Sequence, residues 1–529
     1  MKIVDRHEMK QIEQKSFSDF SLNEQTIIEN VGINLANQLE KDFLHKDPHL
    51  DFVFFIGAGH NGADGLAAAR HLYNRGYRVN AFVVAASEQE LSAGCLQQKN
   101  MAQSFGVHLT LSDSLEDIQA FFQHRQQLPI VVDALFGTGI RLPLSNALYD
   151  LINFINENNS LCLAVDLPSG VDVDSGETVG NAIKADVTYA IGLPKVGCFL
   201  NRGVSHSGLI RVLNAGFPQV LLTEGSKEQI EVAQIAELFR SRSQFGDKRV
   251  FGHIMLLGGS HGLTGALVLA SSAALKIGAG LVTGATWEHQ YQEFIARLMP
   301  EVMTGYIPSD ESEWKALTQK FERYDSLVIG PGLGGSALAQ KAVRTVLGNF
   351  RGPIVIDADG IHVVDIQEDQ ALFKARTQPT ILTPHFGEFA RLMQVSVQQV
   401  RENTISLLNQ CVEKLNCCVV LKGPCTYMAF PSGQIYFNFS PNDGMATGGT
   451  GDVLAGILGG LLGQDHSLRQ SNQKYQRFAS WDKTVALAVL LHSRAGHYAA
   501  KELGARAMVA SSLIDYLPHA FEELESKQE

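Results

Sequence analysis

Residues 52–65 read Phe52-Val53-Phe54-Phe55-Ile56-Gly57-Ala58-Gly59-His60-Asn61-Gly62-Ala63-Asp64-Gly65, a short apolar run followed by a glycine-rich turn. A helix-forming stretch from Leu66 to Arg75 comes next. The order strand, glycine-rich turn and helix is typical of the βαβ unit that opens a parallel sheet. Because the run is apolar throughout, we expect helices to cover this strand on both faces. The stretch therefore predicts a doubly wound α/β fold.

Further apolar runs repeat this pattern, and each predicts a strand. They lie at 130–132 and 161–165 in the first half, and at 254–257, 326–329, 353–356, 380–382 and 418–421 in the second. Helical stretches at 453–462 and 485–503 close the chain, and a polar segment at 222–246 separates the halves. The sequence therefore predicts two three-layer αβα domains, at residues 1–225 and 226–529.

The composition limits the class of protein. Of the 529 residues 45% are hydrophobic, and 43 Lys and Arg against 55 Asp and Glu give a net charge of −12. This charge argues against a broad surface for nucleic acid or for an anionic membrane. Seven cysteines do not suggest a disulfide framework or a zinc site. The N-terminal residues lack the apolar region of a secretory signal, and the longest apolar run, 453–463, is shorter than the ~20 residues that span a bilayer. We therefore expect a cytoplasmic protein that binds neither nucleic acid nor membranes.

In the first half, polar side chains follow three predicted strands at the point where each strand ends. Asn61 and Asp64 follow the first strand, and segments that open with Asp133 and Asp166 follow the next two. Ligands of doubly wound sheets bind beyond the carboxyl ends of the strands, where glycines let backbone N–H groups approach a phosphate. The oxygen atoms of Asn61, Asp133 and Ser169 suit an alkali or alkaline-earth cation rather than zinc.

Each of these features alone also has a structural explanation. A glycine-rich turn can be a plain connection, and an Asp at a strand end can cap the next helix. Three of them in one domain favour a nucleotide-like site. The third glycine of the first turn, Gly62, is followed by Ala63 and Asp64, which departs from the dinucleotide fingerprint. A hydride-transfer enzyme is therefore not the favoured interpretation.

In the second half, the segment Ala446-Thr447-Gly448-Gly449-Thr450-Gly451-Asp452 precedes an apolar helix. Its small residues free the backbone amides at a helix N-terminus, which forms a cradle for negative charge. Asp452 can act as a base or orient a hydroxyl beside that cradle. A plain helix cap would not need this run of glycines. Three more strand ends carry polar or glycine-rich segments, at 330–334, 383–388 and 421–426.

Two residues of these segments are candidates for contacts. Lys422 can contact a nucleotide phosphate as a point charge. An isolated loop histidine is most often structural, but His385 lies beside Pro384 and Glu388 at a strand end, which favours a polar contact with a substrate.

The motifs of the first half, at 59–65, 133–139 and 166–170, resemble those of the NAD(P)H-hydrate epimerases. The family pattern at the first loop is Asn-Asn-Gly-Gly-Asp-Gly, and the chain departs from it at His60 and Ala63. The resemblance implies a Rossmann-like domain in which a potassium ion is held by Asn61, Asp133 and Ser169. It also implies that hydrated NADH or NADPH contacts His60, Asn61, Gly62, Ala63, Asp64, Gly137, Thr138, Gly139, Ile140, Arg141, Leu142, Pro143 and Asp166. Epimerisation at C6 moves an oxygen substituent, so Asp166 is the candidate general acid/base; alternatively it only caps the next turn.

The motifs of the second half, together with Gly258-Gly259-Ser260 and Gly265-Ala266, resemble those of the NAD(P)H-hydrate dehydratases. These ribokinase-like enzymes use ADP, in the bacterial type, or ATP to dehydrate the S epimer. The resemblance implies that the nucleotide, with Mg²⁺, binds Lys422, Gly423, Pro424, Cys425, Thr426 and Gly451. The hydrate would contact Ala266, Gly334, His385 and Asp452. Asp452 would deprotonate the C6 hydroxyl, which attacks the terminal phosphoryl group, and phosphate then leaves.

The two resemblances cover nearly the whole chain and together predict a bifunctional enzyme that repairs hydrated nicotinamide nucleotides. One alternative is a small-molecule kinase that uses Asp452 and the same glycine loop. The other is that the first half is a nucleotide-binding scaffold without catalysis. Helices that flank the sheets and face solvent lead us to expect a homo-oligomer.

Overall fold

The computed structural model describes residues 1–44, 50–123, 125, 127–236, 246–471 and 480–526. These residues form two compact units, Met1–Lys227 and Glu228–Glu529. Residues 237–245 of the predicted polar segment lie outside the described residues. No helix among the described residues is long and apolar enough to cross a membrane.

The first unit contains a seven-stranded sheet in the order β3-β2-β1-β4-β5-β6-β7. All of its strand pairs are parallel. The strands are β1 Asp51–Ile56, β2 Arg78–Val83, β3 His108–Leu111, β4 Ile130–Ala134, β5 Leu161–Val165, β6 Val187–Ile191 and β7 Leu209–Leu213. The strand order reverses between β1 and β4, which is where doubly wound sheets bind ligands.

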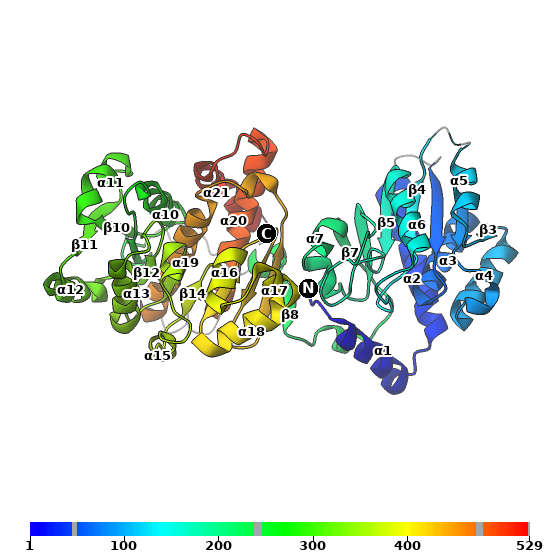
Figure 1. The fold of residues 1–529 in the computed structure, drawn as a ribbon, viewed down its shortest axis with the longest axis horizontal. Coiled ribbons are helices and arrows are strands. Elements are labelled where there is room, and N and C mark those ends of the chain that lie inside the picture. Colours follow the sequence, from blue (N-terminus) through cyan, green and yellow to red (C-terminus); the bar gives the residue numbers. More distant parts are fainter. Residues whose placement is uncertain (45–49, 124, 126, 237–245, 472–479, 527–529) are drawn as a thin grey trace. The chain divides into compact units, whose positions relative to one another are not determined.

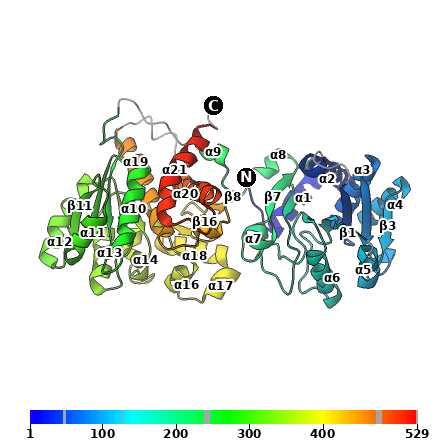
Figure 2. The ribbon, with the colours of Figure 1, turned by 90° about the horizontal axis from the view of Figure 1, so that it is seen from above.

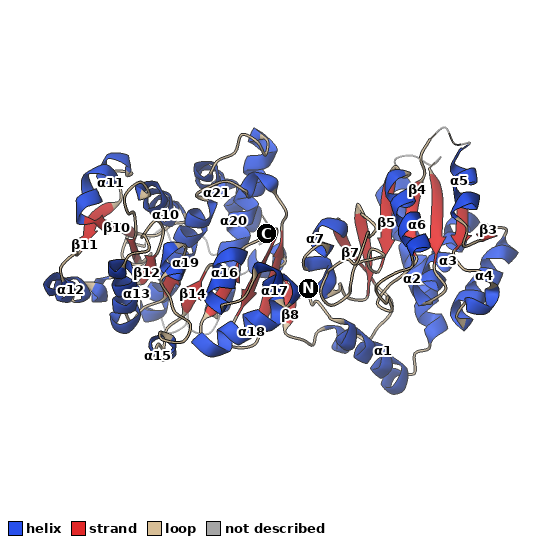
Figure 3. Ribbon diagram, in the orientation of Figure 1, coloured by secondary structure: helices blue, strands red, loops and turns tan. Residues whose placement is uncertain are grey.

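Helices cover both faces of this sheet (Figures 1 and 3). Phe52, Phe54 and Ile56 of β1 pack with buried residues of α2, α3 and α4, whereas Val53 and Phe55 pack with those of α5 and α6. The helices are α1 Arg6–Phe20, α2 Glu24–Leu39, α3 His60–Asn74, α4 Ala93–Phe105, α5 Leu115–Gln123, α6 Asn146–Glu157, α7 Gly203–His206 and α8 Gln219–Leu222. Short π or 3₁₀ turns lie at Glu40–Leu44, Glu88–Glu90 and Val196–Phe199. The alternation of β1 side chains confirms the predicted αβα class.

The helix after β1 begins earlier than the predicted Leu66. It begins at His60, so His60 to Asp64 form its first turn rather than a loop. The glycines permit a close backbone approach: a Cβ on Gly62 would lie 1.9 Å from the carbonyl oxygen of Gly57. The sequence pattern predicted a longer turn because it shows the glycines but not the contact that requires them.

The second unit contains a ten-stranded sheet in the order β11-β10-β9-β12-β13-β14-β15-β16-β17-β8. The strands are β8 Lys227–Gln229, β9 His253–Leu257, β10 Leu281–Trp287, β11 Met303–Ile307, β12 Ser326–Ile329, β13 Ile354–Ile356, β14 Thr380–Leu382, β15 Cys418–Leu421, β16 Cys425–Ala429 and β17 Ile435–Phe439. Pairing is parallel from β11 to β15 and antiparallel among β15, β16 and β17. The sequence analysis missed β8, β10, β11, β16 and β17.

One face of this sheet is covered by the long helices α10, α19, α20 and α21. Intervening residues such as Met255 and Leu257 are buried as well, as expected for a sheet covered on both faces. The helices are α9 Val232–Ala236, α10 Thr264–Lys276, α11 Tyr291–Arg297, α12 Glu311–Thr318, α13 Ala337–Asn349, α14 Asp359–His362, α15 Gln370–Lys374, α16 Phe386–Met393, α17 Val397–Glu402, α18 Thr404–Leu415, α19 Thr450–Ser471, α20 Trp481–Leu503 and α21 Ala510–Glu525. Short 3₁₀ turns lie at Glu288–Gln290, Phe321–Arg323 and Asp443–Met445.

Glycines on α19 fix the position of its N-terminus, because they let the helix approach its neighbours closely. Gly456, Gly459, Gly460 and Gly463 follow the i, i+3, i+4, i+7 spacing of one helix face. A Cβ on Gly456 would lie 2.1 Å from the carbonyl oxygen of Ala270, so α19 packs directly on α10 (Figure 2). The N-terminal loop of α19 is thereby held against the body of this unit.

Candidate active sites

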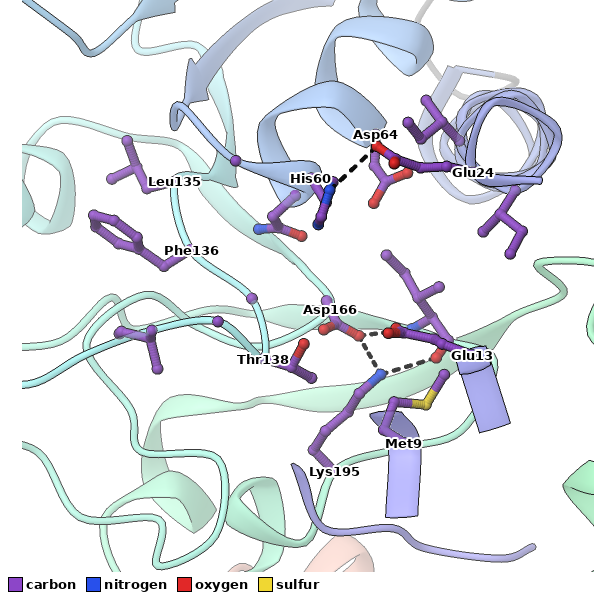
Figure 4. Close-up of a pocket in the computed structure, with 18 of the residues that line it drawn as sticks. Met9, Glu13, Glu24, His60, Asp64, Leu135, Phe136, Thr138, Asp166 and Lys195 are labelled. Carbon is purple, nitrogen blue, oxygen red and sulfur yellow. Dashed lines mark hydrogen bonds and ion pairs between the residues drawn. The ribbon is translucent and has the colours of Figure 1, made fainter. Parts of the chain in front are cut away.

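The first unit has a cavity of about 460 Å³ beyond the carboxyl ends of β1, β4 and β5. Figure 4 shows acidic and basic side chains that point into it from several elements. The predicted substrate residues that line it are His60, Asn61, Asp64, Gly137, Thr138, Gly139, Ile140 and Asp166. Gly62 and Ala63 lie behind it in the buried part of α3, and Arg141, Leu142 and Pro143 lie outside its lining.

An ion pair between Asp166 and Lys195 lies at one end of this cavity (Figure 4). The Lys195 ammonium pairs with Oδ1 of Asp166 and donates a hydrogen bond to the Ile191 carbonyl at 2.8 Å. The N–H of Ile191 also donates to Oδ1 of Asp166, at 3.1 Å. The relative exposure of the two residues is 5% for Asp166 and 1% for Lys195. Asp166 has φ +70°, a left-handed conformation that Asp tolerates better than most residues. The carboxylate is therefore held in one position.

Of the three predicted potassium ligands, Asp133 and Ser169 are joined by hydrogen bonds, and Asn61 lines the cavity. Ser169 donates from Oγ to Oδ1 of Asp133 at 2.7 Å and from its N–H to Oδ2 at 2.8 Å. Asp133 is fully buried, and burial raises its pKa to about 6. Both Oδ1 and Nδ2 of Asn61 are buried without a hydrogen-bond partner in the described structure. The unpaired amide oxygen of Asn61 and the buried carboxyl group of Asp133, which accepts hydrogen bonds from neutral donors only, are ligands that fit a cation.

Three further acids, Glu13, Glu24 and Asp64, and the histidine His60 line the cavity. Asp64 is buried with Oδ1 unpaired, and its pKa is raised well above the ordinary value by burial and then by the charges of Asp166 and Glu13. His60 is exposed and its Nε2 lies 3.2 Å from Oε1 of Glu24. The pocket therefore holds more carboxyl groups than basic groups.

In the second unit, the N-terminal loop of α19 lies against a buried acid–lysine pair. The Lys422 ammonium donates to Oδ1 of Asp357 at 2.8 Å, and the Thr383 hydroxyl donates to the same oxygen at 2.6 Å. Asp357 is 1% exposed, and its Oδ2 has no partner in the described structure. A Cβ on Gly451 would lie 3.0 Å from the Lys422 ammonium nitrogen. The glycine-rich loop therefore lies directly against the Lys422 ammonium group.

Asp452 lies in the first turn of α19, beside this pair. Its pKa is raised to about 7, first by burial and then by the charge of Asp357, although Lys422 opposes the shift. Burial lowers the pKa of Lys422, but the charges of Asp357 and Glu388 outweigh this effect, so it is raised overall. A carboxyl group that titrates near neutral pH is suited to accept a proton during catalysis.

The remaining predicted residues of this unit lie at neighbouring strand ends. The N–H of Gly334 donates to Oδ2 of Asp359 at 2.9 Å. Nδ1 of His385 accepts from the N–H groups of Gly387 and Glu388 at 3.0 and 3.1 Å, so His385 caps α16. Its ring remains exposed, and a contact with the substrate stays a prediction.

The other residues predicted to contact the hydrate or the nucleotide also lie at the ends of strands or helices. Ala266 lies in the first turn of α10, Gly423 and Pro424 lie in the turn between β15 and β16, and Cys425 and Thr426 begin β16. Cys425 is buried at 1% exposure, so a contact between it and a nucleotide stays a prediction.

Comparisons with known proteins cover both units. A family model described as NAD(P)H-hydrate dehydratase matches residues 254–519, and one described as the YjeF-related protein N-terminus matches residues 24–197. The bifunctional NAD(P)H-hydrate repair enzyme Nnr of Moorella thermoacetica is 33% identical over 100% of this chain and 98% of its own length. The chain belongs to the bifunctional NAD(P)H-hydrate repair enzymes. The Thermofilum pendens member of this family is 31% identical over 99% of this chain and 97% of its own length. A solved ADP/ATP-dependent NAD(P)H-hydrate dehydratase from Bacillus subtilis, co-crystallised with ATP/Mg²⁺, is 28% identical over 56% of this chain and 99% of its own, with a TM-score of 0.48.

The family resemblance inferred from the motifs is thus confirmed, whereas several site residues of this repair enzyme were missed. Lys195 is the single charge in the apolar segment 190–200, a signal that was present in the sequence. Asp357 follows a strand, as Asp133 does, and could have been found in the same way. Glu13 comes from α1, far from every motif, and no local pattern marks it.

Proposed function

We propose that this chain repairs hydrated nicotinamide nucleotides, with one activity in each of the predicted domains 1–225 and 226–529. The first domain interconverts the R and S epimers of hydrated NADH and NADPH. The second dehydrates the S epimer and consumes ADP, or ATP. The observation that carries this proposal is Asp452, a carboxyl group whose pKa is raised to about 7 by burial, next to Lys422 and a glycine-rich helix N-terminus.

In the second domain, Asp452 takes the proton from the C6 hydroxyl. The oxygen then attacks the terminal phosphoryl group, while the N–H groups of residues 447–451 and Lys422 offset the negative charge. Phosphate departs with the electrons of the C6–O bond, and loss of a proton from C5 restores the dihydropyridine ring. Mg²⁺ bound with the nucleotide would screen the phosphates.

In the first domain, Asp166 accepts and returns a proton at the C6 oxygen. Lys195 holds this carboxylate in place, and the loop from Gly137 to Pro143 offers backbone N–H groups to the substrate. A potassium ion held by Asn61, Asp133 and Ser169 would supply positive charge at an acidic site.

The test uses the purified full chain with separated R and S hydrates of NADH, in buffer with Mg²⁺ and K⁺. With ADP or ATP, the reduced-nicotinamide absorbance should return from both epimers. Asp452→Asn should abolish recovery from both, and Asp166→Asn should abolish rapid recovery from R alone. Phosphate transfer to a stable product would instead indicate a small-molecule kinase. Recovery from S alone in the unaltered chain would indicate that the first domain is a binding scaffold.

A further inference from the structure

The helix α1 forms a wall of the cavity in the first unit. Met9, Glu13 and Phe17 line the cavity and are spaced i, i+4, i+8, so they form one stripe along the helix. Met9 and Phe17 are the apolar members of this stripe. Glu13 is therefore an acid at a position where an apolar residue would pack equally well, and this needs an explanation.

The carboxyl group of Glu13 has no structural role that the described residues reveal. It makes no hydrogen bond and no ion pair with any of them, and it is half-buried at the cavity surface. Figure 4 shows it reaching from α1 toward Asp166 and Lys195. Asp64, the other unpaired acid of the pocket, also lines the cavity but is 7% exposed, whereas Glu13 is only half-buried.

Glu13 and the Asp166–Lys195 pair come from different elements that line the cavity. Asp166 follows β5 at the edge of the sheet, and Glu13 comes from α1. A flat ring bound between the two carboxyl groups would present one face to each of them. Epimerisation of a hydroxyl group requires access to both faces of the carbon, which is the arrangement that two separated carboxyl groups provide.

From this geometry we infer that Glu13 is a second catalytic acid–base residue of the epimerase, acting on the C6 oxygen at the ring face opposite Asp166. The inference rests on the proposed function of the first domain. Glu13 donates a proton to the C6 hydroxyl as the C6–O bond breaks. The electron pair leaves with the oxygen as water, and the N1 lone pair forms a C6=N1⁺ double bond. Water then adds to the other face and gives its proton to the Asp166 carboxylate. The reverse reaction uses the two carboxyl groups in exchanged roles, and solvent returns the proton between turnovers.

The charges around Glu13 agree with a proton donor. Its pKa is raised, chiefly by burial and further by the charge of Asp166, and this outweighs the opposing charges of Lys195, His60 and Lys10. Asp64 also faces Glu13 and adds to the acidity of the pocket. A carboxyl group with a raised pKa keeps its proton to a higher pH than an ordinary Glu.

The experiment compares Glu13→Gln and Glu13→Asp in the full chain, with Lys15→Gln on the exposed side of α1 as the control. Pure R hydrate is incubated without nucleotide, so that the second domain is silent, and the S epimer is followed by chromatography. We expect Glu13→Gln to lower kcat by about 10²–10³-fold with Kd for the hydrate unchanged, because general acid–base catalysis contributes about 10²–10⁴-fold. Glu13→Asp should recover part of the rate. The decline of the wild-type rate at higher pH, where Glu13 loses its proton, should be absent from the residual rate of Glu13→Gln.

The possible outcomes separate this inference from the proposed function. ADP-dependent dehydration of pure S hydrate should be equal in all variants, which shows that each preparation is folded and active. A Glu13→Gln variant with wild-type kcat, or one that changes only Kd while the pH profile stays the same, overturns the acid–base role and leaves the epimerase proposal standing. An unaltered chain that dehydrates S hydrate but does not epimerise R hydrate overturns the epimerase proposal, and this inference with it.

Discussion

Replacing Lys195 by Met would leave the Asp166 carboxylate buried without its cation. The side chains of the pair are 1% and 7% exposed, so water from the cavity would hydrate the remaining carboxylate only in part. Removal of one partner from a buried ion pair costs about 3–5 kcal/mol. The Ile191 N–H still donates to Asp166, which places the expected loss at the lower end, about 3 kcal/mol at pH 7. At about 3 kcal/mol per molar urea, this lowers the unfolding midpoint by about 1 M.

The assay separates the two units by their spectra. All three tryptophans, Trp287, Trp314 and Trp481, lie in the second unit, so their fluorescence reports that unit, whereas far-UV circular dichroism reports both. We expect the urea transition followed by circular dichroism to shift and the fluorescence transition to stay. The loss of unfolding free energy should become smaller as the pH is lowered. A buried carboxylate without a cation is less unfavourable once it binds a proton and becomes neutral.

The double variant Lys195→Met, Asp166→Asn is the matched control. It removes both charges, and Asn adopts the left-handed backbone of position 166 as readily as Asp does. Its midpoint should return to within about 1 kcal/mol of the unaltered chain, since loss of both partners of a buried pair is often nearly neutral. The reasoning fails if the single variant loses less than about 0.5 kcal/mol, or if the double variant is as unstable as the single one.

Three further predictions concern the other features of the two sites. The rate of S-hydrate dehydration should increase as the pH rises through about 7, where Asp452 loses its proton. Asp452→Asn should lower kcat by about 10²–10⁴-fold, while the nucleotide affinity measured by calorimetry should not change. Gly449→Ala should lower the melting temperature of the second unit, because φ is +95° and the new methyl group would lie 2.6 Å from Leu269; Gly448→Ala, which meets no atom within 4 Å, should leave it unchanged. Potassium chloride should raise the melting temperature of the first unit above its value in equimolar choline chloride. This stabilisation should decrease below about pH 6, where Asp133 binds a proton, and it should be absent in Asn61→Leu.

The sequence predicted the features of the fold that repeat locally. Apolar runs marked β1, β4, β5 and most parallel strands of the second sheet, because a strand covered on both faces must be apolar throughout. It missed the short antiparallel strands β16 and β17, in which polar residues such as Thr426 and Asn438 interrupt the apolar run. The predicted start of α3 was also too late. The close approach of Gly62 to Gly57 requires a glycine, but the sequence alone does not show that the two residues are in contact.

The candidate sites were predictable to the extent that their residues follow strands. Asp133, Asp166 and Asp452 each belong to a motif that the sequence shows, and the structure brings Asp166 to the lining of the cavity and Asp452 beside Lys422. Lys195 and Glu13 depend on tertiary packing, since one reaches Asp166 from the loop after β6 and the other from a helix near the N-terminus. The motif at a strand end does not indicate which side chains from distant parts of the sequence will contact it in the folded protein.

The two sites share one electrostatic arrangement, and it bears on which acid moves protons. In the second unit, Asp357 is paired with Lys422, whereas Asp452 has no cation of its own and titrates near neutral pH. In the first unit, Asp166 is paired with Lys195, whereas Glu13 has no partner and a raised pKa. A carboxylate that already has a cation gains little by binding a proton, but an unpaired buried one gains much. By this reasoning Glu13 corresponds to Asp452, and an epimerase that relied on Asp166 alone would lack the group best placed to supply a proton.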